Sequence, residues 1–433
     1  MEPLNIALIG CGTVGGGVAK LLLEQPERLA ARAGRPLVLR RVVVRDINKQ
    51  RAIAVPRELL TTDLQDVVRD PNIHVAVELI GGVDRARQAV LELLAAGKDV
   101  VTANKALLAQ HGAEVFDAAR RHGRAVAFEA SVAGGIPIIA ALAQSLAANQ
   151  ILAIQGILNG TSNFILTSMT EGNQGYADAL AEAQRRGYAE ADPTLDVNGA
   201  DAAHKLAILA HIGFGVPVPL SAIECRGIAE VDALDIRFAG ELGYVIKLLA
   251  EAFLSDNQLA LHVSPVLLRR ATPLAQVRGA YNAVYVVGDA VGDALFYGRG
   301  AGQMPTASAV TADLIDLAIG RGQRTFQTLR LWAPNGARAQ LRPPATVRTR
   351  FYLRLLVEDK PGVLAEVTRV LAKHEISIAS VIQHEAPDEA EGERVQLVIM
   401  THTAATGPFR SAAADMERLS CVAAPAVYYP VAD

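Results

Sequence analysis

A glycine-rich turn between a short apolar strand and an apolar helix is the feature that most limits the fold of this chain. Residues 4–10, "LNIALIG", are predicted as a buried strand, and residues 11–25, "CGTVGGGVAKLLLEQ", as the helix that follows it. Gly10, Gly12 and Gly15 have the spacing GxGxxG. In such a turn the first glycine permits the sharp bend, the second lets a pyrophosphate approach, and the third lets the helix lie close to the strand. The motif alone is weak, and its meaning depends on the elements around it.

Strands and helices continue to alternate after this turn. Further strands are predicted at 37–46, 74–82, 99–105 and 124–130, with a helix over 84–97. This alternation implies a parallel sheet with right-handed crossovers. We therefore predict an α/β fold whose first part, residues 1–130, is a Rossmann-type unit that binds a dinucleotide, and which is completed by a long amphipathic helix at about 305–330. A tight turn without a ligand is the alternative.

The end of the second predicted strand bears on the choice of cofactor. The segment 43–51, "VVRDINKQR", contains both Arg45 and Asp46, followed by two more basic residues. An acid at this place accepts the ribose hydroxyls of NAD, whereas an arginine accommodates the phosphate of NADP. The sequence favours NADP through Arg45, and a solvated basic loop remains the alternative.

The pattern changes after residue 130. A helix is predicted over 134–149, mixed strand and turn signals follow at 151–166, and alternating stretches such as 258–268 indicate a second, antiparallel sheet. We therefore expect an α+β catalytic and dimerisation domain over 131–304. A linker rich in Pro, Gly and Arg is expected at 334–350, and a small α+β module at 351–433.

Composition and charge exclude several classes of protein. The chain has 433 residues, 51% apolar, and a formal net charge of −3, which is too close to neutral to suggest nucleic acid or an anionic membrane as partner. No apolar run reaches the roughly 20 residues that span a bilayer, and the N-terminus lacks a basic region typical of a signal peptide. The three cysteines are widely spaced, as in a reducing compartment. These features are typical of a cytoplasmic enzyme.

One lysine stands in an otherwise apolar helix. In the segment 187–210, "GYAEADPTLDVNGADAAHKLAILA", the residues around Lys205 are nearly all apolar, which is typical of a buried helix. Asp201 lies four residues earlier, on the same helical face. The pair could be an ordinary exposed ion pair, but ionised groups rarely enter a core unless they are paired or functional. A partly desolvated amine can have a lowered pKa and act as a general acid.

Other charged residues extend this candidate site. Lys105 follows a predicted strand at the carboxyl end of the sheet, where such sheets bind ligands, although a solvent-facing lysine is the alternative. Glu190 and Asp196 are suited to another cation, most simply the ammonium of an amino-acid substrate. Asp192, before a proline, is predicted to organise a turn. Together these residues indicate an oxidoreductase of an amino acid or amino aldehyde.

Several segments together resemble homoserine dehydrogenase. They are "GCGTVGGGV", "VTANKALLA", "FEASVAGGIPII", "GILNGTSNFILTSM", the segment 187–210 and "GRGAGQMPTASAV", and they occur in the order and spacing of that family over residues 1 to about 330. The last 80 or so residues, with "VEDKPGVLAEV", resemble the ACT regulatory domain of the monofunctional bacterial members, a βαββαβ fold. No kinase-like extension precedes the first strand.

The resemblance implies a reaction and roles for individual residues. The reaction is the reversible NAD(P)H-dependent reduction of L-aspartate 4-semialdehyde to L-homoserine, on the route to threonine and methionine. Lys205 matches the general acid, Asp201 and Lys105 match its partners, and Glu190 and Asp196 match the groups that hold the substrate's amino end. The cofactor would contact the glycine turn and its neighbours, namely Gly10, Gly12, Thr13, Val14, Gly15, Arg45, Lys105 and Gly302.

The resemblance also implies a cation, an effector and an assembly. "EASVAGGI" matches a sodium-binding loop, with Glu129 and the carbonyls of Val132, Gly134 and Ile136 as ligands. Pro361 and Gly362 lie in a strand-to-helix loop whose exposed backbone amides could receive an amino-acid carboxylate. By the resemblance the effector is threonine, and a dimerisation or packing domain without a ligand is the alternative. A homodimer or homotetramer is expected by analogy. The rival interpretations are another NADP-dependent oxidoreductase of a small amino acid, and a cofactor-binding sensor without turnover.

Overall fold

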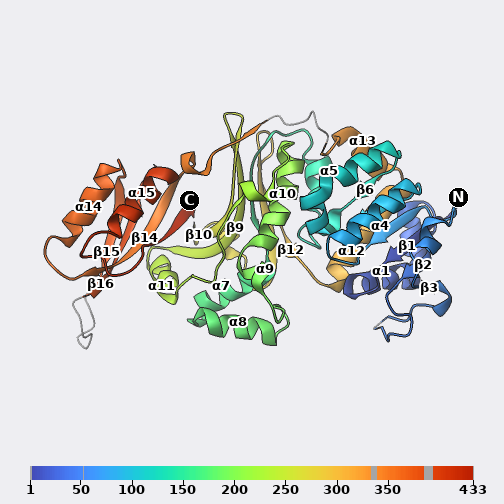
Figure 1. The fold of residues 1–433 in the computed structure, drawn as a ribbon, viewed down its shortest axis with the longest axis horizontal. Coiled ribbons are helices and arrows are strands. Elements are labelled where there is room, and N and C mark those ends of the chain that lie inside the picture. The colour runs from blue at the N-terminus through green and yellow to red at the C-terminus, as the bar shows by residue number, and fades with distance from the viewer. Residues whose placement is uncertain (1, 52, 333–338, 385–393, 433) are drawn as a thin grey trace.

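The protein is elongated, with three structured regions arranged along its length (Figure 1). The structure is a computed structural model, and it describes residues 2–51, 53–332, 339–384 and 394–432. A parallel sheet with its helices forms one end, an antiparallel sheet lies in the middle, and a small α/β unit forms the other end (Figure 1).

The first sheet has six strands in the order β3-β2-β1-β4-β5-β6, and every recorded pairing in it is parallel. This is the strand order of a dinucleotide-binding fold, as the sequence predicts. Its central strands are buried along their whole length, because helices cover both faces of such a sheet. The elements are β1 (Leu4–Ile9), α1 (Thr13–Glu24), α2 (Pro26–Ala33), β2 (Leu37–Val43), β3 (Leu60–Thr61), α3 (Gln65–Val68), β4 (Val75–Glu78), α4 (Asp84–Ala95), β5 (Asp99–Thr102), α5 (Lys105–Arg121) and β6 (Val126–Ala127).

A helix from late in the chain returns to this sheet. Helix α12 (Gln303–Ala318) lies against α1. A second helix, α13 (Arg321–Leu329), follows after a break at Gly320, whose φ is +79°, so the single long helix expected at about 305–330 is two helices. The contact between α1 and α12 is close, because a Cβ atom on Gly17 would come within 2.9 Å of the Ala307 Cβ. Gly17 therefore serves helix packing rather than the cofactor.

The middle of the molecule is built on antiparallel strands, as the alternating stretches predict. The strands are β7 (Ile151–Ile157), β8 (Glu224–Cys225), β9 (Tyr244–Ser255), β10 (Gln258–Arg269), β11 (Tyr281–Gly288) and β12 (Gly292–Arg299). The helices are α6 (Ile138–Ala140), α7 (Gly160–Gly172), α8 (Tyr176–Arg185), α9 (Thr194–Val197), α10 (Ala200–Phe214) and α11 (Ala233–Glu241).

Two segments of the middle region also differ from their predictions. The helix predicted over 134–149 is only three residues of α-helix, Ile138–Ala140, continued by a π-helical turn over Ala141–Ser145. The glycines and proline before it cannot extend the helix toward its N-terminus. The mixed signals over 151–166 resolve into strand β7 followed by helix α7, because the turn residues there cap a helix.

The C-terminal unit has the predicted βαββαβ order, with one additional two-residue strand, β17, before its second helix. It consists of β14 (Arg348–Glu358), α14 (Val363–Lys373), β15 (Ile378–Gln383), β16 (Arg394–Thr401), β17 (Ala404–Ala405), α15 (Thr406–Met416) and β18 (Val427–Ala432). Strand β18 pairs in parallel with β10, so the two sheets are continuous. Residues 334–338 of the predicted linker lie outside the described residues, and its remainder contains β13 (Gln340–Leu341), which also pairs with β10.

A buried ion pair also joins the C-terminal unit to the middle region. Asp235 of α11 is fully buried and accepts hydrogen bonds from Arg354 Nε and Nη2 of β14, at 2.6 and 3.0 Å. The Tyr352 hydroxyl donates to the same carboxylate at 2.9 Å. Because breaking a buried ion pair leaves one charge uncompensated, this contact fixes how the two regions meet. Within the described part of the chain, none of the helices is long and apolar enough to cross a membrane.

Candidate active site

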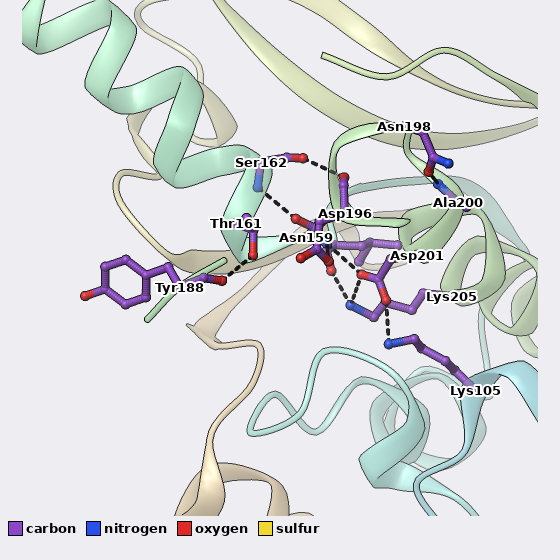
Figure 2. A network of polar contacts seen from close by, with 11 residues as sticks. Lys105, Asn159, Thr161, Ser162, Tyr188, Asp196, Asn198, Ala200, Asp201 and Lys205 are labelled. Carbon is purple, nitrogen blue, oxygen red and sulfur yellow. Dashed lines mark hydrogen bonds and ion pairs between the residues drawn. The ribbon is translucent and has the colours of Figure 1, made fainter. Parts of the chain in front are cut away.

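The lysine in the apolar helix is buried, and two of its three donors are used within the protein. Lys205 lies on α10, whose residues are buried on nearly every side, and its side chain is 10% exposed. Its Nζ donates to Asp201 Oδ2 at 2.7 Å and to the carbonyl of Leu158 at 2.6 Å (Figure 2). An ammonium group has three N–H donors. In the described residues two are used, which leaves one for a ligand.

A second lysine reaches the same carboxylate from the other sheet. Lys105 is the first residue of α5, and its Nζ lies 2.5 Å from Asp201 Oδ1 (Figure 2). Asn104 caps this helix by accepting from the Leu107 amide at 3.1 Å, and it donates to the Gly82 carbonyl at 2.7 Å. This cap fixes Lys105 as the first residue of α5. The cluster therefore lies between the parallel sheet and the antiparallel region.

The charges in this cluster shift one another's pKa values. Burial alone would raise the pKa of Asp201, but Lys205 and Lys105 together hold it well below its usual range. Burial lowers the pKa of Lys205, and Lys105 lowers it further, whereas Asp201 acts in the opposite direction. A carboxylate that stays ionised beside an amine of lowered pKa is suited to proton transfer near neutral pH.

The acids predicted around the lysine are not all placed together. Asp196 of α9 is half-buried, and Asn159 joins it to Asp201 through hydrogen bonds from Nδ2 of 2.7 and 2.9 Å. Asp192 accepts from the Thr194 amide at 3.1 Å, which confirms its predicted turn. Glu190 is exposed, and among the described residues no hydrogen bond or ion pair joins its carboxylate to the cluster.

A cavity of about 720 Å³ opens at the carboxyl ends of β1, β2 and β4. Such a volume is typical of small-molecule sites. Its lining includes Gly10 and Gly12 of the glycine turn, and four cationic residues, Arg45, Lys49, Arg51 and Arg85.

Two glycines of the turn, Gly10 and Gly15, have the backbone roles that the sequence predicts for them. Gly10 has φ +107°, and a Cβ there would come within 2.7 Å of the Leu79 carbonyl oxygen. A Cβ on Gly15 would collide with the Gly10 carbonyl, so this position serves the packing of α1. At Gly12 a Cβ would meet nothing within 4 Å, which leaves its surface open toward a ligand. Thr13 and Val14 form the first turn of α1 and do not line the cavity.

Arg45 lies at the basic end of the cavity, and its side chain is exposed. Asp46 Oδ1 accepts from the Asn48 amide at 2.7 Å, and Arg51 donates to the carbonyl oxygens of Asp46 and Lys49, at 2.5 and 2.9 Å. One carboxylate oxygen of Asp46 therefore stabilises the turn that contains Asp46. A cavity lined by several cations at this point fits a cofactor that carries an additional phosphate.

The loop predicted to bind a cation is buried against the turn that precedes α12. Gly135 donates to the Arg299 carbonyl at 3.0 Å, and Gly302 forms the N-cap of α12 with φ +123°. Glu129 is 5% exposed, and its oxygens accept from the amides of Ile139 and Ala140 at 2.9 and 2.7 Å. Burial raises the pKa of Glu129 to about 7.

Among the residues that the structure describes, no cationic side chain is paired with Glu129. Asp313 accepts from the Glu129 amide at 2.9 Å, and none of the ion pairs in the described residues involves Glu129. A buried carboxylate is one of the oxygen ligands that hard cations prefer. No group of three or more His, Cys, Asp or Glu side chains that could hold a metal occurs in the described ranges.

Sequence reasoning missed several residues of the site. Asn159 and the Leu158 carbonyl, at the end of β7, hold Asp201 and Lys205, and Asn104 positions Lys105. The signal for both asparagines was present, since each precedes a helix as an N-cap residue does. Their proximity to the lysines depends on tertiary contacts that the sequence does not show. Arg85 of α4 is a further missed residue, on the cofactor cavity.

Comparison with known protein families matches all three regions. Residues 10–129 match the family model "Homoserine dehydrogenase, NAD binding domain", residues 137–315 match "Homoserine dehydrogenase", and residues 351–420 match "ACT domain". The chain is 43% identical to the homoserine dehydrogenase of Neisseria gonorrhoeae over 429 residues, which covers 98% of each chain. It is 38% identical to that of Bacillus subtilis, over 98% of this chain and 96% of the other.

Solved structures give the same result. A homoserine dehydrogenase from Thiobacillus denitrificans superimposes with a TM-score of 0.93 at 44% identity, covering 100% of this chain and 99% of that one. A hyperthermophilic archaeal homoserine dehydrogenase in complex with NADPH superimposes with a TM-score of 0.62 at 28% identity, over 74% of this chain and 98% of that one. The resemblance seen in the sequence is thus confirmed over the full length. This chain belongs to the homoserine dehydrogenase family, in the form that carries a C-terminal ACT domain.

Proposed function

We propose that this protein interconverts L-aspartate 4-semialdehyde and L-homoserine with NADP(H) as cofactor, as a step toward threonine and methionine. The observation that carries the proposal is the cluster of Lys205, Asp201 and Lys105. It joins the two sheets, and the parallel sheet also carries a cavity suited to a dinucleotide. Membership of the homoserine dehydrogenase family supports the same reaction.

The chain's own residues supply the proton and the orientation. A bound nicotinamide supplies or accepts the hydride. When the aldehyde carbon is reduced, its oxygen becomes an alkoxide, and Lys205 donates its third N–H proton to that oxygen. This interaction is stronger in the transition state than in the ground state, so it accelerates the reaction. Asp201 holds both lysines by accepting from each through a different oxygen.

Asp196 and Glu190 are proposed to hold the substrate's ammonium group. Asp196 is half-buried and lies next to the cluster through Asn159, which supports its part. Glu190 is exposed, two residues after Tyr188, whose carbonyl accepts from Thr161 at the start of α7 (Figure 2). For Glu190 to take part, its side chain would have to turn toward the cluster when substrate binds.

NADP is the proposed cofactor in preference to NAD. Arg45, Lys49 and Arg51 line the cavity near the end of β2, where a 2′-phosphate would lie. Gly10 and Gly12 would hold the pyrophosphate against the N-terminus of α1, with Thr13 and Val14 contributing the first amides. Gly302 and Lys105 do not line this cavity, so contacts from them would be with the nicotinamide half.

Sodium is proposed to bind at Glu129 and the carbonyls of Val132, Gly134 and Ile136. The buried carboxylate without a cationic partner supports this. The Ile136 carbonyl accepts from the Ile138 amide at 2.8 Å, so it would be shared with the ion. The expected function of the ion is to stabilise the loop against the turn before α12. A rise in melting temperature with NaCl, compared with choline chloride at equal ionic strength, is the test.

Threonine is proposed as an inhibitor that binds the ACT domain. Exposed residues at Pro361 and Gly362 lead into α14, and Gly362 has φ +96°. A short path could carry the effect to the substrate side: Arg226 donates to the Tyr428 carbonyl of β18 at 2.7 Å. Two residues later, the Ile228 amide donates to the Val197 carbonyl at 2.8 Å, next to Asp196.

Inhibition by millimolar threonine in the full chain, weakened in Arg226→Gln while threonine still raises the melting temperature, is the expected result. No effect of threonine on rate or on stability would contradict the regulatory proposal. The dehydrogenase proposal would then be unaffected.

A homodimer or homotetramer is also proposed. Strand β12, at the edge of the sheet, exposes Leu295 and Tyr297 on one face, and Tyr297 stacks on Tyr281 at 5.1 Å between ring centroids. Large apolar side chains together on an edge strand are suited to a second copy of the chain. Sedimentation of the wild type and of Tyr297→Lys measures this directly.

The test of the activity is the appearance of NADPH at 340 nm with purified protein, NADP and L-homoserine, with other small hydroxy and amino acids as controls. Turnover that requires L-homoserine is expected. Turnover with a different substrate would favour another oxidoreductase on this scaffold. Cofactor binding without any turnover would favour a sensor.

A further inference from the structure

Asn159 stands at the centre of the acid cluster, although no part of the reaction above requires it. It lies between β7 and α7, is 5% exposed, and is surrounded by Asp196, Asp201 and the first turn of α7 (Figure 2). A buried asparagine has two donors and one acceptor group to satisfy. How these are satisfied determines the geometry of both carboxylates.

The orientation of the Asn159 amide follows from its neighbours. The Ser162 backbone N–H donates to Oδ1 at 2.8 Å, and a backbone amide can only donate. Nδ2 must therefore face the opposite side, where it donates to Asp196 Oδ1 at 2.7 Å and to Asp201 Oδ2 at 2.9 Å. The amide is thus fixed at the helix end and gives both its protons to carboxylates.

The Asn159 amide, which donates to both acids, holds the Asp196 and Asp201 carboxylates in a defined arrangement. Asp201 Oδ2 accepts from Asn159 and Lys205 together, while Oδ1 accepts from Lys105. Asp196 also raises the pKa of Lys205, so it is close enough to influence the proton donor. If the amide were absent, the carboxylate of Asp196 would be free to turn toward the Lys205 ammonium.

We propose that Asn159 is a positioning residue that keeps Asp196 directed away from Lys205, so that Asp196 remains available to the substrate's ammonium and Lys205 to the aldehyde oxygen. The inference rests on the proposed function, because it assigns a role to Asn159 within that reaction. It adds a specific cause: one side-chain amide separates the group that binds the amino end from the group that protonates the carbonyl.

The principal test uses Asn159→Ser. Serine retains an oxygen that can cap α7, so the helix end is preserved, but it has no amide to reach the two acids. The expected result is a kcat for aldehyde reduction lowered about 10–100-fold, the effect of losing a hydrogen bond to a charged group. The KM for the amino-acid substrate should rise, and the fall of the rate at high pH should move to higher pH. NADPH binding and melting temperature serve as controls and should stay near the wild-type values.

A second variant, Asn159→Asp, has the same shape and also caps a helix, but it replaces the donor with a carboxylate. Once ionised, the added charge stabilises the ammonium form of Lys205, so the fall of the reduction rate should move to higher pH. This variant tests the positioning role of Asn159 if Asn159→Ser does not fold.

Two results would overturn the inference. One is a wild-type pH profile and KM in both variants. The other is a lowered melting temperature with an unchanged pH profile, as expected if Asn159 only caps α7. Absence of homoserine turnover in the wild type would instead contradict the proposed function, so the two failures can be told apart.

Discussion

The cofactor cavity and the lysine cluster are built on different physical principles. The cavity is large and open, and it is shaped by glycine backbone and by cations such as Arg45, which is exposed. The cluster is buried. Its Asp201 carboxylate is paired with two lysines and accepts a hydrogen bond from Asn159. In the cavity, each cation contributes to cofactor binding separately, and solvent screens its charge. In the cluster, each charge depends on the others, so single changes there should have much larger effects.

The largest effect is expected from Lys205→Met, which preserves the length and apolar stem of the side chain but removes the amine. We expect kcat to fall by about 10²–10⁴-fold, the usual contribution of a general acid. NADPH affinity should be unchanged, because Lys205 does not line the cavity. Stopped-flow turnover and fluorescence titration measure the two quantities. A variant with near-normal turnover would remove Lys205 from the mechanism.

A smaller effect is expected from Arg45→Gln. Loss of a charged hydrogen bond to the 2′-phosphate should raise the KM for NADP about 10–100-fold. The KM for NAD should hardly change, because NAD lacks that phosphate. Steady-state kinetics with both cofactors give the comparison. An equal loss for both would mean that Arg45 acts on the shape of the loop and not on the phosphate.

Within the glycine turn, two matched substitutions should separate ligand contact from packing. Gly12→Ala places a methyl group in open space, so the protein should remain stable while the KM for the cofactor rises about tenfold, equivalent to about 1.4 kcal/mol. Gly15→Ala directs the methyl group into the Gly10 carbonyl, so it should lower the melting temperature. Calorimetry and kinetics on both variants test this. Equal loss of stability in the two would contradict it.

The smallest effect is expected from salt. Raising NaCl from low to physiological levels should increase the KM for NADP a few-fold, because exposed cations are screened over about 8–10 Å. The kcat should change little, since the lysine cluster is buried. Potassium chloride as a control separates screening from binding of sodium. A kcat that follows ionic strength as steeply as KM would remove the distinction between the two regions.

The features that the sequence predicted correctly were local ones. The strand, glycine turn and helix of residues 4–24 are contiguous, and Asp201 and Lys205 lie one helical turn apart, so periodicity alone brings them together. The burial of Lys205 followed from its apolar neighbours. The family resemblance added the reaction and the ACT domain, which composition and spacing did not identify.

The features that the sequence did not predict depend on distant contacts. Asn159 meets Asp201 across 42 positions in the chain, and only the fold brings them together. The pairing of β18 with β10, which makes the two sheets continuous, joins segments from opposite ends of the second half of the chain. The π-helical turn at Ala141–Ser145 is also not revealed by periodicity.

The most direct test of the central claim is the pH dependence of kcat, measured for aldehyde reduction and for homoserine oxidation with the same preparation. Reduction needs Lys205 protonated and oxidation needs it deprotonated. Burial lowers the pKa of Lys205, so both profiles should show one shared ionisation below the ordinary lysine value of about 10.4. The reduction rate should fall, and the oxidation rate should rise, as pH passes through it. Both changes should vanish from the residual activity of Lys205→Met. Profiles that show no shared ionisation, or that persist in this variant, would contradict Lys205 as the proton donor.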